Sequence, residues 1–500
     1  MAIKGYTFYI DGVKQNNVPQ GSPTYTFTGL SSNSSHHIKV EVVDYANNVS
    51  TPGELDASTL TYTAGSPMGP ADKAAIDSIV NAAIATSGAV QSFTSANAGC
   101  IIGITSDKGD YYQAYGHDYS GAALTTDMKM RWGSCTKMAT ATLILAQIDA
   151  GHISFDDTLS RFGAKTSGVP NGDIITIKQL LMMRSGIKDY LQQDGAIQQS
   201  YFLNPTQTFD PMPYIRSYPP LFTPGTQTSY SNSNYYLLGR ILEWCDLNYG
   251  SGRDARTIIL EDFCQELGMV ESEWPPIGTN YLTAPYSRAG AFNQAWPTIQ
   301  GLGFLAFLAP IFVPGVQLTK TIEFTAVSTS WADASGALAG TISDFVRFGE
   351  ALRDGALISS DLKQLREELF ELYIPYAPDP AKPWIGDGWS GAGLGVFQFG
   401  EWLGWIGNIA GYMTALFYNY KNGAVLAIMT NWMLFDVADL FYQIRYALYP
   451  DSVHNQPTIR RLDAGVPSGE AFGNTRAYVY HAPGDDDSHT DVPFNVPFYI

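Results

Sequence analysis

The sequence predicts an α+β fold, in which an antiparallel sheet is flanked by helices and preceded by a small all-β unit. Three observations support this class. Residues 5–59 alternate apolar and polar side chains with the period of β-strands. From residue 71 onward apolar side chains recur at helical spacing, beginning with "ADKAAIDSIVNAAIATSG". Strand-like segments lie at both ends of this second region, so we expect both ends to contribute to one sheet.

Turn residues and composition divide the chain into four parts. Residues 1–60 are expected to form the β domain, with strands "YTFYIDGV", "TYTFTGL" and "HHIKVEVVDYANNV". Residues 61–70 are a linker rich in small and turn-forming side chains. Residues 71–450 are the main domain, and residues 451–500, which include "PGDDDSHTD", are an appended tail.

Within the main domain, the expected strands near the start are "CIIGIT" and "YYQAYG", and they follow the first helix. The expected strands near the end are "GVFQFG", "YMTALFYNY" and "AVLAIMT". Asn422-Gly423 joins the last two, and this dipeptide favours a two-residue hairpin turn. We therefore expect these two strands to be antiparallel neighbours.

Composition indicates a large folded protein and argues against a nucleic-acid partner, a metal site and a disulfide framework. The 500 residues are 45% hydrophobic and 15% charged, which suits a large core and is not typical of a disordered chain. The net charge of -18 opposes binding to polyanions, so we expect no nucleic-acid partner. The seven histidines show no metal-ligand spacing, and we expect neither a metal nor another cofactor. The four cysteines are too few for a disulfide framework, and whether Cys245 pairs with Cys264 stays open.

No segment predicts a membrane span or a secretion signal. The N-terminus "MAIKGYTFYIDG" has no continuous apolar run of the kind that a signal peptide requires. Residues 301–318 are apolar and long enough to cross a membrane, but they contain Pro310, Pro314 and several glycines. We expect this segment to be a buried insertion, a pocket wall or a subunit contact.

In the stretch "RWGSCTKMATATLILAQIDAG", residues 131–151, Lys137 is the only charged residue between Gly133 and Ile148. Ser134 and Lys137 are three positions apart and share one helix face. A lysine held among apolar neighbours loses hydration, which lowers its pKa and lets it take a proton from a serine hydroxyl. The alternative is a capping serine followed by a lysine that reaches solvent. Ser185 and Lys188 have the same spacing, but Gly186 between them argues against a continuous helix.

The motifs around Ser134 resemble the serine β-lactamase-like superfamily, which includes D-Ala-D-Ala carboxypeptidases, class C β-lactamases and related esterases. The resemblance covers about residues 70–445 and implies a β-lactamase or penicillin-binding-protein fold, with a helical subdomain beside the sheet. It is carried by "GSCTKMATATLILAQIDAGHISFDDTLS", "ITIKQLLMMRSGIKDYL", "FTPGTQTSYSNSNYYLLGRILE", "ASGALAGTISDFVRFGEAL" and "GNIAGY", in that order.

The resemblance assigns Tyr230-Ser231-Asn232 as the second motif, Y-x-N. It implies that Tyr230 relays the serine proton and that Asn232 orients Lys137 and a substrate carbonyl. Because a cation beside a phenol favours the ionised form, we expect Lys137 to lower the pKa of Tyr230 from its usual value of about 10.

The third motif departs from the family. Where the superfamily has Lys or His, then Thr or Ser, then Gly, this chain has Trp405-Ile406-Gly407. The resemblance still implies that Gly407 and Asn408 flank the site, so that the Asn408 N–H joins the Ser134 N–H in an oxyanion hole. Trp405 would contact the substrate without a charge, which disfavours ligands that bear a carboxylate. The sequence therefore favours an esterase or amidase over a true β-lactamase.

These features predict a serine acyl hydrolase with a Ser-Lys-Tyr acyl-enzyme mechanism, either D-Ala-D-Ala carboxypeptidase-like or carboxylesterase-like, acting on a small acyl or peptide substrate. The β-rich N-terminus resembles the later strands of a fibronectin type III module. Such a module beside a cell-wall hydrolase fold resembles bacteriophage minor tail proteins. We therefore expect a virion location, or otherwise a cytoplasmic one.

That setting implies further partners and leaves alternatives open. The target would be cell-wall peptide or envelope ester bonds of bacteria. The truncated β domain would leave an open sheet edge, so we expect a homo-oligomer, specifically a trimer, or contacts with other tail proteins. One alternative is a non-catalytic tail-tip protein that binds the host or has a structural role. The other is a family VIII-like carboxylesterase unrelated to a virion.

Overall fold

The computed structural model describes most of the chain in two compact units, Met1–Ser66 and Pro67–Ile500. Expected features at residues 24–30, 301–318 and 451–500 lie outside the described residues. The described residues are 3–14, 35–44, 48–58, 65–91, 97–191, 207–276, 279–293, 320–323, 325–375, 389–409, 411–432 and 435–450.

The first unit contains one antiparallel sheet in its described part, with strand order β2-β1-β3-β4. A second sheet, which a sandwich requires, is not among these described strands. The expected strand over residues 6–13 is wrong in one respect, because it breaks at Asp11-Gly12. Both residues have positive φ (50° and 79°) and form a two-residue hairpin turn. The strands are β1 (Ile3–Ile10), β2 (Val13–Lys14), β3 (Ser35–Asp44) and β4 (Gly53–Ser58).

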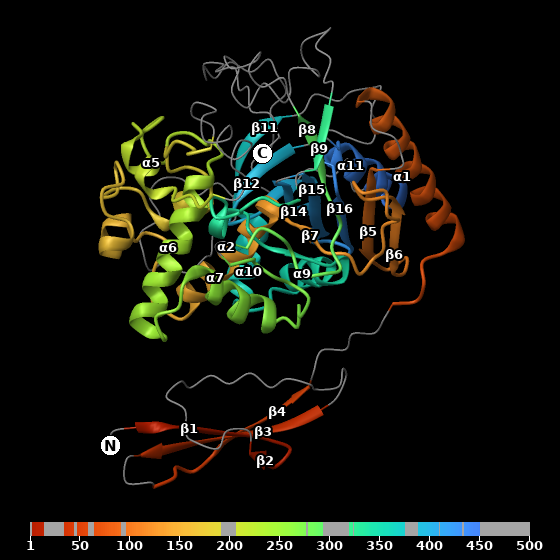
Figure 1. Ribbon diagram of the computed structural model, residues 1–500. Helices are drawn as coiled ribbons and strands as arrows, with labels where there is room; N and C mark the ends of the chain where they lie inside the picture. The colour runs from red at the N-terminus through yellow and green to blue at the C-terminus, as the bar shows by residue number, and fades with distance from the viewer. Residues whose placement is uncertain are drawn as a thin grey trace, which may run out of the picture. The chain divides into compact units, whose positions relative to one another are not determined.

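The second unit is built on an eight-stranded antiparallel sheet of order β11-β12-β13-β14-β15-β16-β5-β6 (Figure 1). Pairing of β16 with β5 joins the two ends of the domain, as predicted. The strands are β5 (Gly99–Thr105), β6 (Tyr111–Gly116), β11 (Phe370–Pro375), β12 (Trp389–Gly393), β13 (Phe397–Phe399), β14 (Trp402–Ile409), β15 (Tyr412–Asn419) and β16 (Val425–Thr430).

The predicted hairpin of β15 and β16 forms, but its turn is longer than two residues. Tyr418 pairs with Val425, and the N–H of Gly423 donates to the carbonyl of Asn419 at 2.9 Å. Gly423 has φ 77°, which an L side chain rarely adopts. The Asn-Gly pair therefore closes a wider turn.

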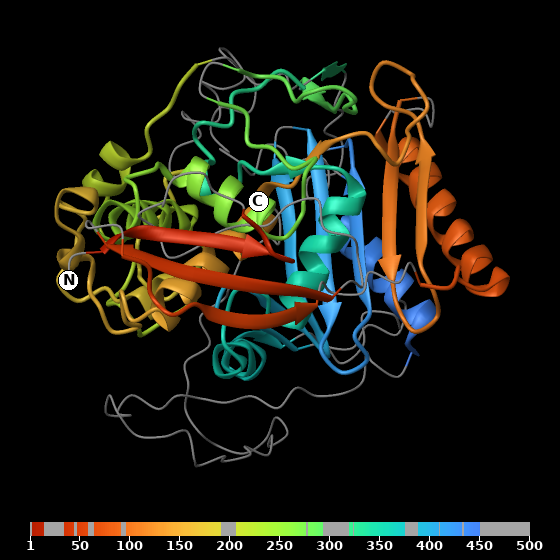
Figure 2. The ribbon, with the colours of Figure 1, turned by 90° about the horizontal axis from the view of Figure 1, so that it is seen from below.

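Helices cover both faces of this sheet (Figure 2). α11 (Val437–Leu448) packs on one face, where Phe441 stacks on Phe417 at a centroid distance of 4.2 Å. α1 (Pro70–Gln91) lies beside α11. α9 (Ile342–Asp354) packs on the other face, where a Cβ at Gly349 would lie 2.5 Å from Val425. The sheet is therefore buried on both sides.

A helical subdomain adjoins this layer, and α2 lies between its helix α6 and strand β14 (Figure 1). The first ten residues of α2 are all buried. These elements and the remaining short ones are η1 (Gly133–Cys135), α2 (Thr136–Asp149), η2 (Leu159–Lys165), α3 (Ile177–Leu181), α5 (Met212–Ser217), α6 (Asn232–Tyr249), α7 (Ala255–Ile258), η3 (Ile259–Gln265), η5 (Asp333–Ser335), α10 (Ser360–Glu368), and the strand pairs β7 (Met130–Arg131) with β10 (Ala339–Gly340) and β8 (Gly290–Asn293) with β9 (Lys320–Glu323).

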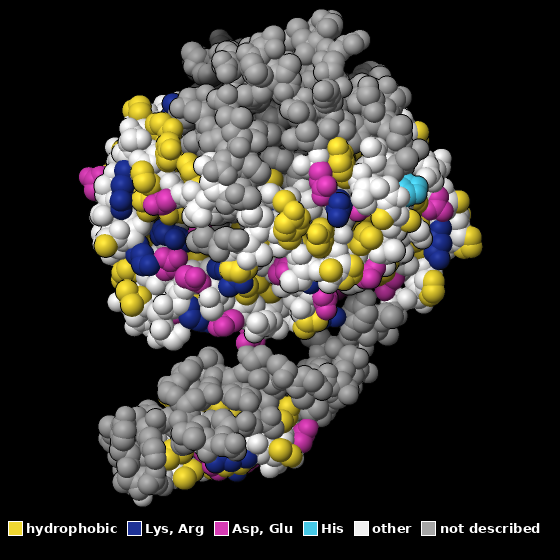
Figure 3. Space-filling view, viewed as in Figure 1, with side chains coloured by type: hydrophobic (Ala, Val, Ile, Leu, Met, Phe, Trp, Pro, Cys, Tyr) yellow, Lys and Arg dark blue, Asp and Glu magenta, His cyan; other side chains and the backbone are white. Residues whose placement is uncertain are grey.

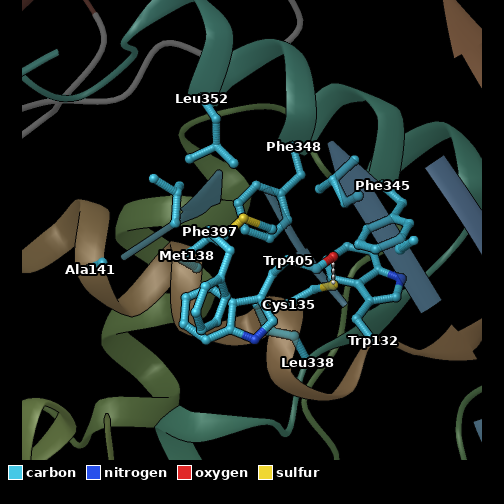
Figure 4. Close-up of a cluster of buried hydrophobic side chains, with 14 of the residues drawn as sticks. Trp132, Cys135, Met138, Ala141, Leu338, Phe345, Phe348, Leu352, Phe397 and Trp405 are labelled. Carbon is cyan, nitrogen blue, oxygen red and sulfur yellow. Dashed lines mark hydrogen bonds between the residues drawn. The ribbon is translucent and has the colours of Figure 1, made fainter. Parts of the chain in front are cut away.

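An aromatic cluster ties η1 and α2 to the sheet and to α9 (Figure 4). Trp132 stacks on Phe345 at 4.9 Å, and Trp405 lies 4.4 Å from Phe397 between ring centroids. Burying large rings is among the strongest contributions to a core. Trp132 therefore holds the segment before η1 against α9, while the contact of Trp405 with Phe397 lies within the sheet, between β14 and β13.

The described surface of the second unit carries both signs of charge among apolar and polar side chains (Figure 3). Within the described ranges, none of the helices combines the length and apolar character that a membrane crossing would need.

Candidate active site

Ser134 lies in the 3-10 helix η1, directly before α2, and only 4% of it is exposed. Gly133 before it has φ 54°, and a Cβ there would lie 2.8 Å from the backbone N of Asn408. Glycine therefore lets η1 lie against β14 while it takes a left-handed conformation. The N–H groups at the start of a helix have no intrahelical acceptor, which favours negative charge near Ser134.

Lys137 lies one turn further along and is fully buried. Its Nζ donates to Ser134 Oγ at 3.0 Å, to Asn232 Oδ1 at 2.7 Å and to the carbonyl of Ser335 at 2.6 Å. These three acceptors match the three N–H bonds of an ammonium group. The arrangement can hold the proton that Ser134 would lose.

Burial lowers the pKa of Lys137 to about 7, and the negative charge of Asp189 opposes this shift. The sequence predicted this direction. Near neutral pH a large fraction of the amine is therefore uncharged, with a lone pair available toward Ser134 Oγ. The apolar helix thus makes the lysine a possible base.

Tyr230 lies on the other side of the nucleophile oxygen. Its hydroxyl is 2.7 Å from Ser134 Oγ, and it donates to Asn232 Oδ1 at 3.3 Å. The expectation of a lowered phenol pKa is wrong: burial raises the pKa of Tyr230 well above its usual value, and the hydrogen bond with Ser134 offsets only part of this effect. The partly buried phenol keeps its proton because its ionised form would lose hydration.

Asn232 is the first residue of α6 and is 3% exposed. Its Oδ1 accepts from Lys137 and from Tyr230, and its Nδ2 donates to Asp189 Oδ2 at 2.9 Å. The structure therefore brings the four predicted residues into one hydrogen-bonded group. Asp189 and Ser335 also belong to it. Sequence reasoning assigned no role to either, although both lie in segments that carry the resemblance.

Trp405 lies on β14 with only 3% of its surface exposed (Figure 4). Its ring centroid is 5.8 Å from that of Tyr235 and 6.3 Å from that of Tyr230. The indole is therefore enclosed by protein rings behind Tyr230.

Gly407 and Asn408 bring β14 beside the nucleophile, as the resemblance implied. A Cβ at Gly407 would lie 2.0 Å from the carbonyl O of Trp132 and 2.4 Å from Thr414 Oγ1. Only glycine permits this approach of the two backbones. Asn408 comes directly after Gly407 in β14 and is partly exposed. Its backbone lies where η1 contacts the strand.

The competing nucleophiles lack this environment. Ser185 is buried, bonds to Asn234 and accepts the N–H of Ile187, while Lys188 lies over the ring of Tyr218. Ser185 and Lys188, which share the spacing of Ser134 and Lys137, therefore do not contact each other. Cys135 adjoins Ser134, but burial raises the pKa of its thiol to about 12, so the reactive thiolate is scarce.

The remaining candidate groups among the described residues are the cysteines, possible metal ligands and Ser390. All four cysteines are free and buried, so Cys245 and Cys264 do not pair. In the part of the chain that the structure describes, no group of His, Cys, Asp and Glu has the arrangement of a metal site. Ser390, a further serine of the second unit, lies in strand β12.

Comparison with known sequences points to one family. The family model described as Beta-lactamase matches residues 80–449. The D-alanyl-D-alanine-carboxypeptidase/endopeptidase AmpH of Escherichia coli is 27% identical over 169 residues, which are 33% of this chain and 42% of that protein. The chain thus matches less than half the length of this relative.

Solved structures share the fold at low identity. A D-stereospecific amidohydrolase from Streptomyces sp. is 21% identical with a TM-score of 0.58, covering 75% of this chain and 98% of its own. A D-amino acid amidase from Ochrobactrum anthropi SV3 is 18% identical with a TM-score of 0.58, covering 76% and 99%. An octameric penicillin-binding protein homologue from Pyrococcus abyssi is 19% identical with a TM-score of 0.57, covering 77% and 78%.

Proposed function

Because the chain belongs to the beta-lactamase family of serine hydrolases, we propose that it cleaves ester or amide bonds through an acyl-enzyme on Ser134. The observation that carries the proposal is the pair of contacts at one oxygen. Ser134 Oγ lies 3.0 Å from Lys137 Nζ and 2.7 Å from the Tyr230 hydroxyl. A base and a proton donor at this range are what a serine nucleophile needs.

In acylation, neutral Lys137 takes the hydroxyl proton of Ser134 while Oγ attacks the substrate carbonyl carbon. The backbone N–H groups of Ser134 and Asn408 donate hydrogen bonds to the carbonyl oxygen, on which negative charge develops. Tyr230 holds its proton at neutral pH and donates it to the departing amine or alcohol. The proton on Lys137 then restores the phenol, so the site returns to its starting charge.

Deacylation uses the same groups in reverse. Neutral Lys137 takes a proton from a water molecule that attacks the acyl carbon, and the proton passes to Ser134 Oγ as the ester bond breaks. The products are a carboxylic acid and free enzyme. No cofactor is needed for either step.

The substrate class follows from the third motif. Trp405 places an uncharged, enclosed ring where the superfamily has Lys or His, so a substrate carboxylate would lack a charge-assisted hydrogen bond worth about 1.5–3 kcal/mol. We infer that neutral esters and amides are preferred over penicillins and over peptides with a free C-terminal carboxylate. The two amide-hydrolysing neighbours in fold are compatible with this preference.

Hydrolysis of short-chain aryl esters and of D-amino acid amides tests the proposal. We expect turnover by the unmodified chain and its loss, by at least about 1000-fold, in Ser134→Ala and Lys137→Ala. Ser185→Ala is the matched control, because that serine is buried in the same domain without a lysine contact. Activity that persists in Ser134→Ala would contradict the assignment, and a folded but inert chain would favour a non-catalytic binding protein.

For the biological setting, we propose a tail component of a bacteriophage that acts on the bacterial envelope. The support is the compact β unit at residues 1–66 and its sequence resemblance to part of a fibronectin type III module. We further propose that the protein is a homo-oligomer, specifically a trimer. Light scattering on the full chain tests this, and a monomer at micromolar concentration would contradict it.

A further inference from the structure

Asp189 is a buried carboxylate behind the residues that contact Ser134. It is 2% exposed. Its Oδ2 accepts from Asn232 Nδ2 at 2.9 Å, and its Oδ1 accepts from the backbone N–H of Leu191 at 2.9 Å. The mechanism proposed above does not use it. A carboxylate is rarely kept at this depth unless it is paired with donors.

The contact with Asp189 determines which end of the Asn232 amide faces the nucleophile. An ionised carboxylate only accepts hydrogen bonds, so the NH₂ end of Asn232 must point toward it. The carbonyl end then faces Lys137 and Tyr230, both of which donate to Oδ1. With the amide reversed, an NH₂ group would oppose the ammonium, and Lys137 would lose one of its three acceptors.

Asp189 also supplies the negative charge near Lys137. The titratable groups that face Lys137 are Cys135 of η1, Tyr235 of α6, Tyr230 ahead of α6, and Asp189. Burial raises the pKa of the thiol and of both phenols, so these three stay neutral near pH 7. Burial also raises the pKa of Asp189, while hydrogen bonds from Leu191 and Asn232 and the charge of Lys137 lower it. Two donors on its two oxygens fit the ionised form.

We propose that Asp189 is a positioning residue of this hydrolase, which fixes the orientation of Asn232 and provides the negative charge that faces Lys137. The inference rests on the proposed function, because it concerns the base of that reaction. It acts through Asn232 and touches neither the substrate nor the reacting oxygen.

Asp189→Asn tests the proposal, because it removes the charge and keeps the shape. The NH₂ end of the new amide must face either the Leu191 N–H or Asn232, so one hydrogen bond is lost or Asn232 reverses. We expect kcat to fall roughly 10- to 100-fold. The acid limb of the pH profile should move to lower pH by about one unit, because Lys137 loses the charge that favours its protonated form. Asp189→Glu keeps the charge and should retain the position of the limb.

The control is Asp118→Asn, which alters a second buried aspartate (3% exposed) that caps the loop before Ala122. It should leave the acid limb in place. If Asp189→Asn does not fold, Asp189→Ser removes the same charge in a smaller side chain and carries the same expectation.

A readout without turnover separates this inference from the proposed function. The ε-carbon NMR signal of Lys137, assigned by its absence in Lys137→Arg, reports the lysine titration in wild type and in Asp189→Asn. A lower midpoint in the variant supports the inference even if no substrate is hydrolysed. Equal midpoints, or an unshifted acid limb in an active enzyme, would overturn it while leaving Ser134 as the nucleophile.

Discussion

The indole of Trp405 lies behind the phenol of Tyr230, with 6.3 Å between ring centroids and 55° between ring planes. An uncharged ring therefore occupies the position that the resemblance assigns to the third motif. Lys137 is left as the cation that contacts Ser134 Oγ among the described residues. Because Tyr230 keeps its proton, we propose the lysine as the base of the reaction.

The pH dependence of activity should follow Lys137. Its pKa is about 7 in the folded protein, and only the neutral amine accepts a proton. We therefore expect kcat/KM to rise about tenfold per pH unit below about pH 7 and to level off above it. Steady-state rates between about pH 5 and pH 9 measure this, within the range where circular dichroism shows folded protein. A profile that falls as pH rises through 7 would contradict the assignment of the base.

Substitution of Trp405 should change both substrate preference and stability. The unmodified chain should hydrolyse short-chain aryl esters faster than penicillins by orders of magnitude. Trp405→His introduces a side chain that can carry charge beside Tyr230, and should shift the ratio of kcat/KM values toward carboxylate-bearing substrates. Because the indole is buried, the smaller ring should also cost about 2–4 kcal/mol of unfolding free energy. Efficient penicillin turnover by the unmodified chain would count against this reading.

Gly407→Ala tests whether the contact of β14 with η1 builds the oxyanion site. The added methyl would lie 2.0 Å from the carbonyl O of Trp132, so the two backbones must separate. We expect kcat to fall at least about 100-fold, as when one oxyanion donor is lost. The matched control is Gly69→Ala, where a Cβ meets nothing within 4 Å. Equal activities of the two variants would exclude an oxyanion role for this strand.

Periodicity and turn residues were sufficient for much of the fold. The helical spacing after residue 71 predicted α1, and continuous apolar runs predicted β5 and β16. The hairpin of β15 and β16 was predicted, but the length of its turn was not, because Asn-Gly is compatible with several turn geometries. β4 was not predicted, since "GELDAS" has little β propensity and forms mainly through its pairing with β3.

Site residues that belong to a motif with a known role could be predicted from the sequence. Residues that meet only in the folded chain could not. The spacing of three residues allowed a contact between Ser134 and Lys137, but Ser185 and Lys188 share that spacing without a contact, and the ordered motifs of the resemblance were needed to choose between the two pairs. Asp189 and the carbonyl of Ser335 join them from distant segments. Both segments carry the resemblance, but nothing in them assigned a role to either residue. The pKa of Tyr230 was predicted in the wrong direction, because the extent of burial depends on packing that the sequence does not display.

Covalent labelling tests the central claim most directly, because it needs no knowledge of the natural substrate. The full chain is incubated with a fluorophosphonate or an activated ester, and the adduct is mapped by mass spectrometry of peptides. We predict one modified residue, Ser134, with labelling lost in Ser134→Ala, greatly slowed in Lys137→Ala and unchanged in Ser185→Ala. Modification of Ser185 or Ser390 instead, or no serine adduct on protein shown to be folded, would contradict the account.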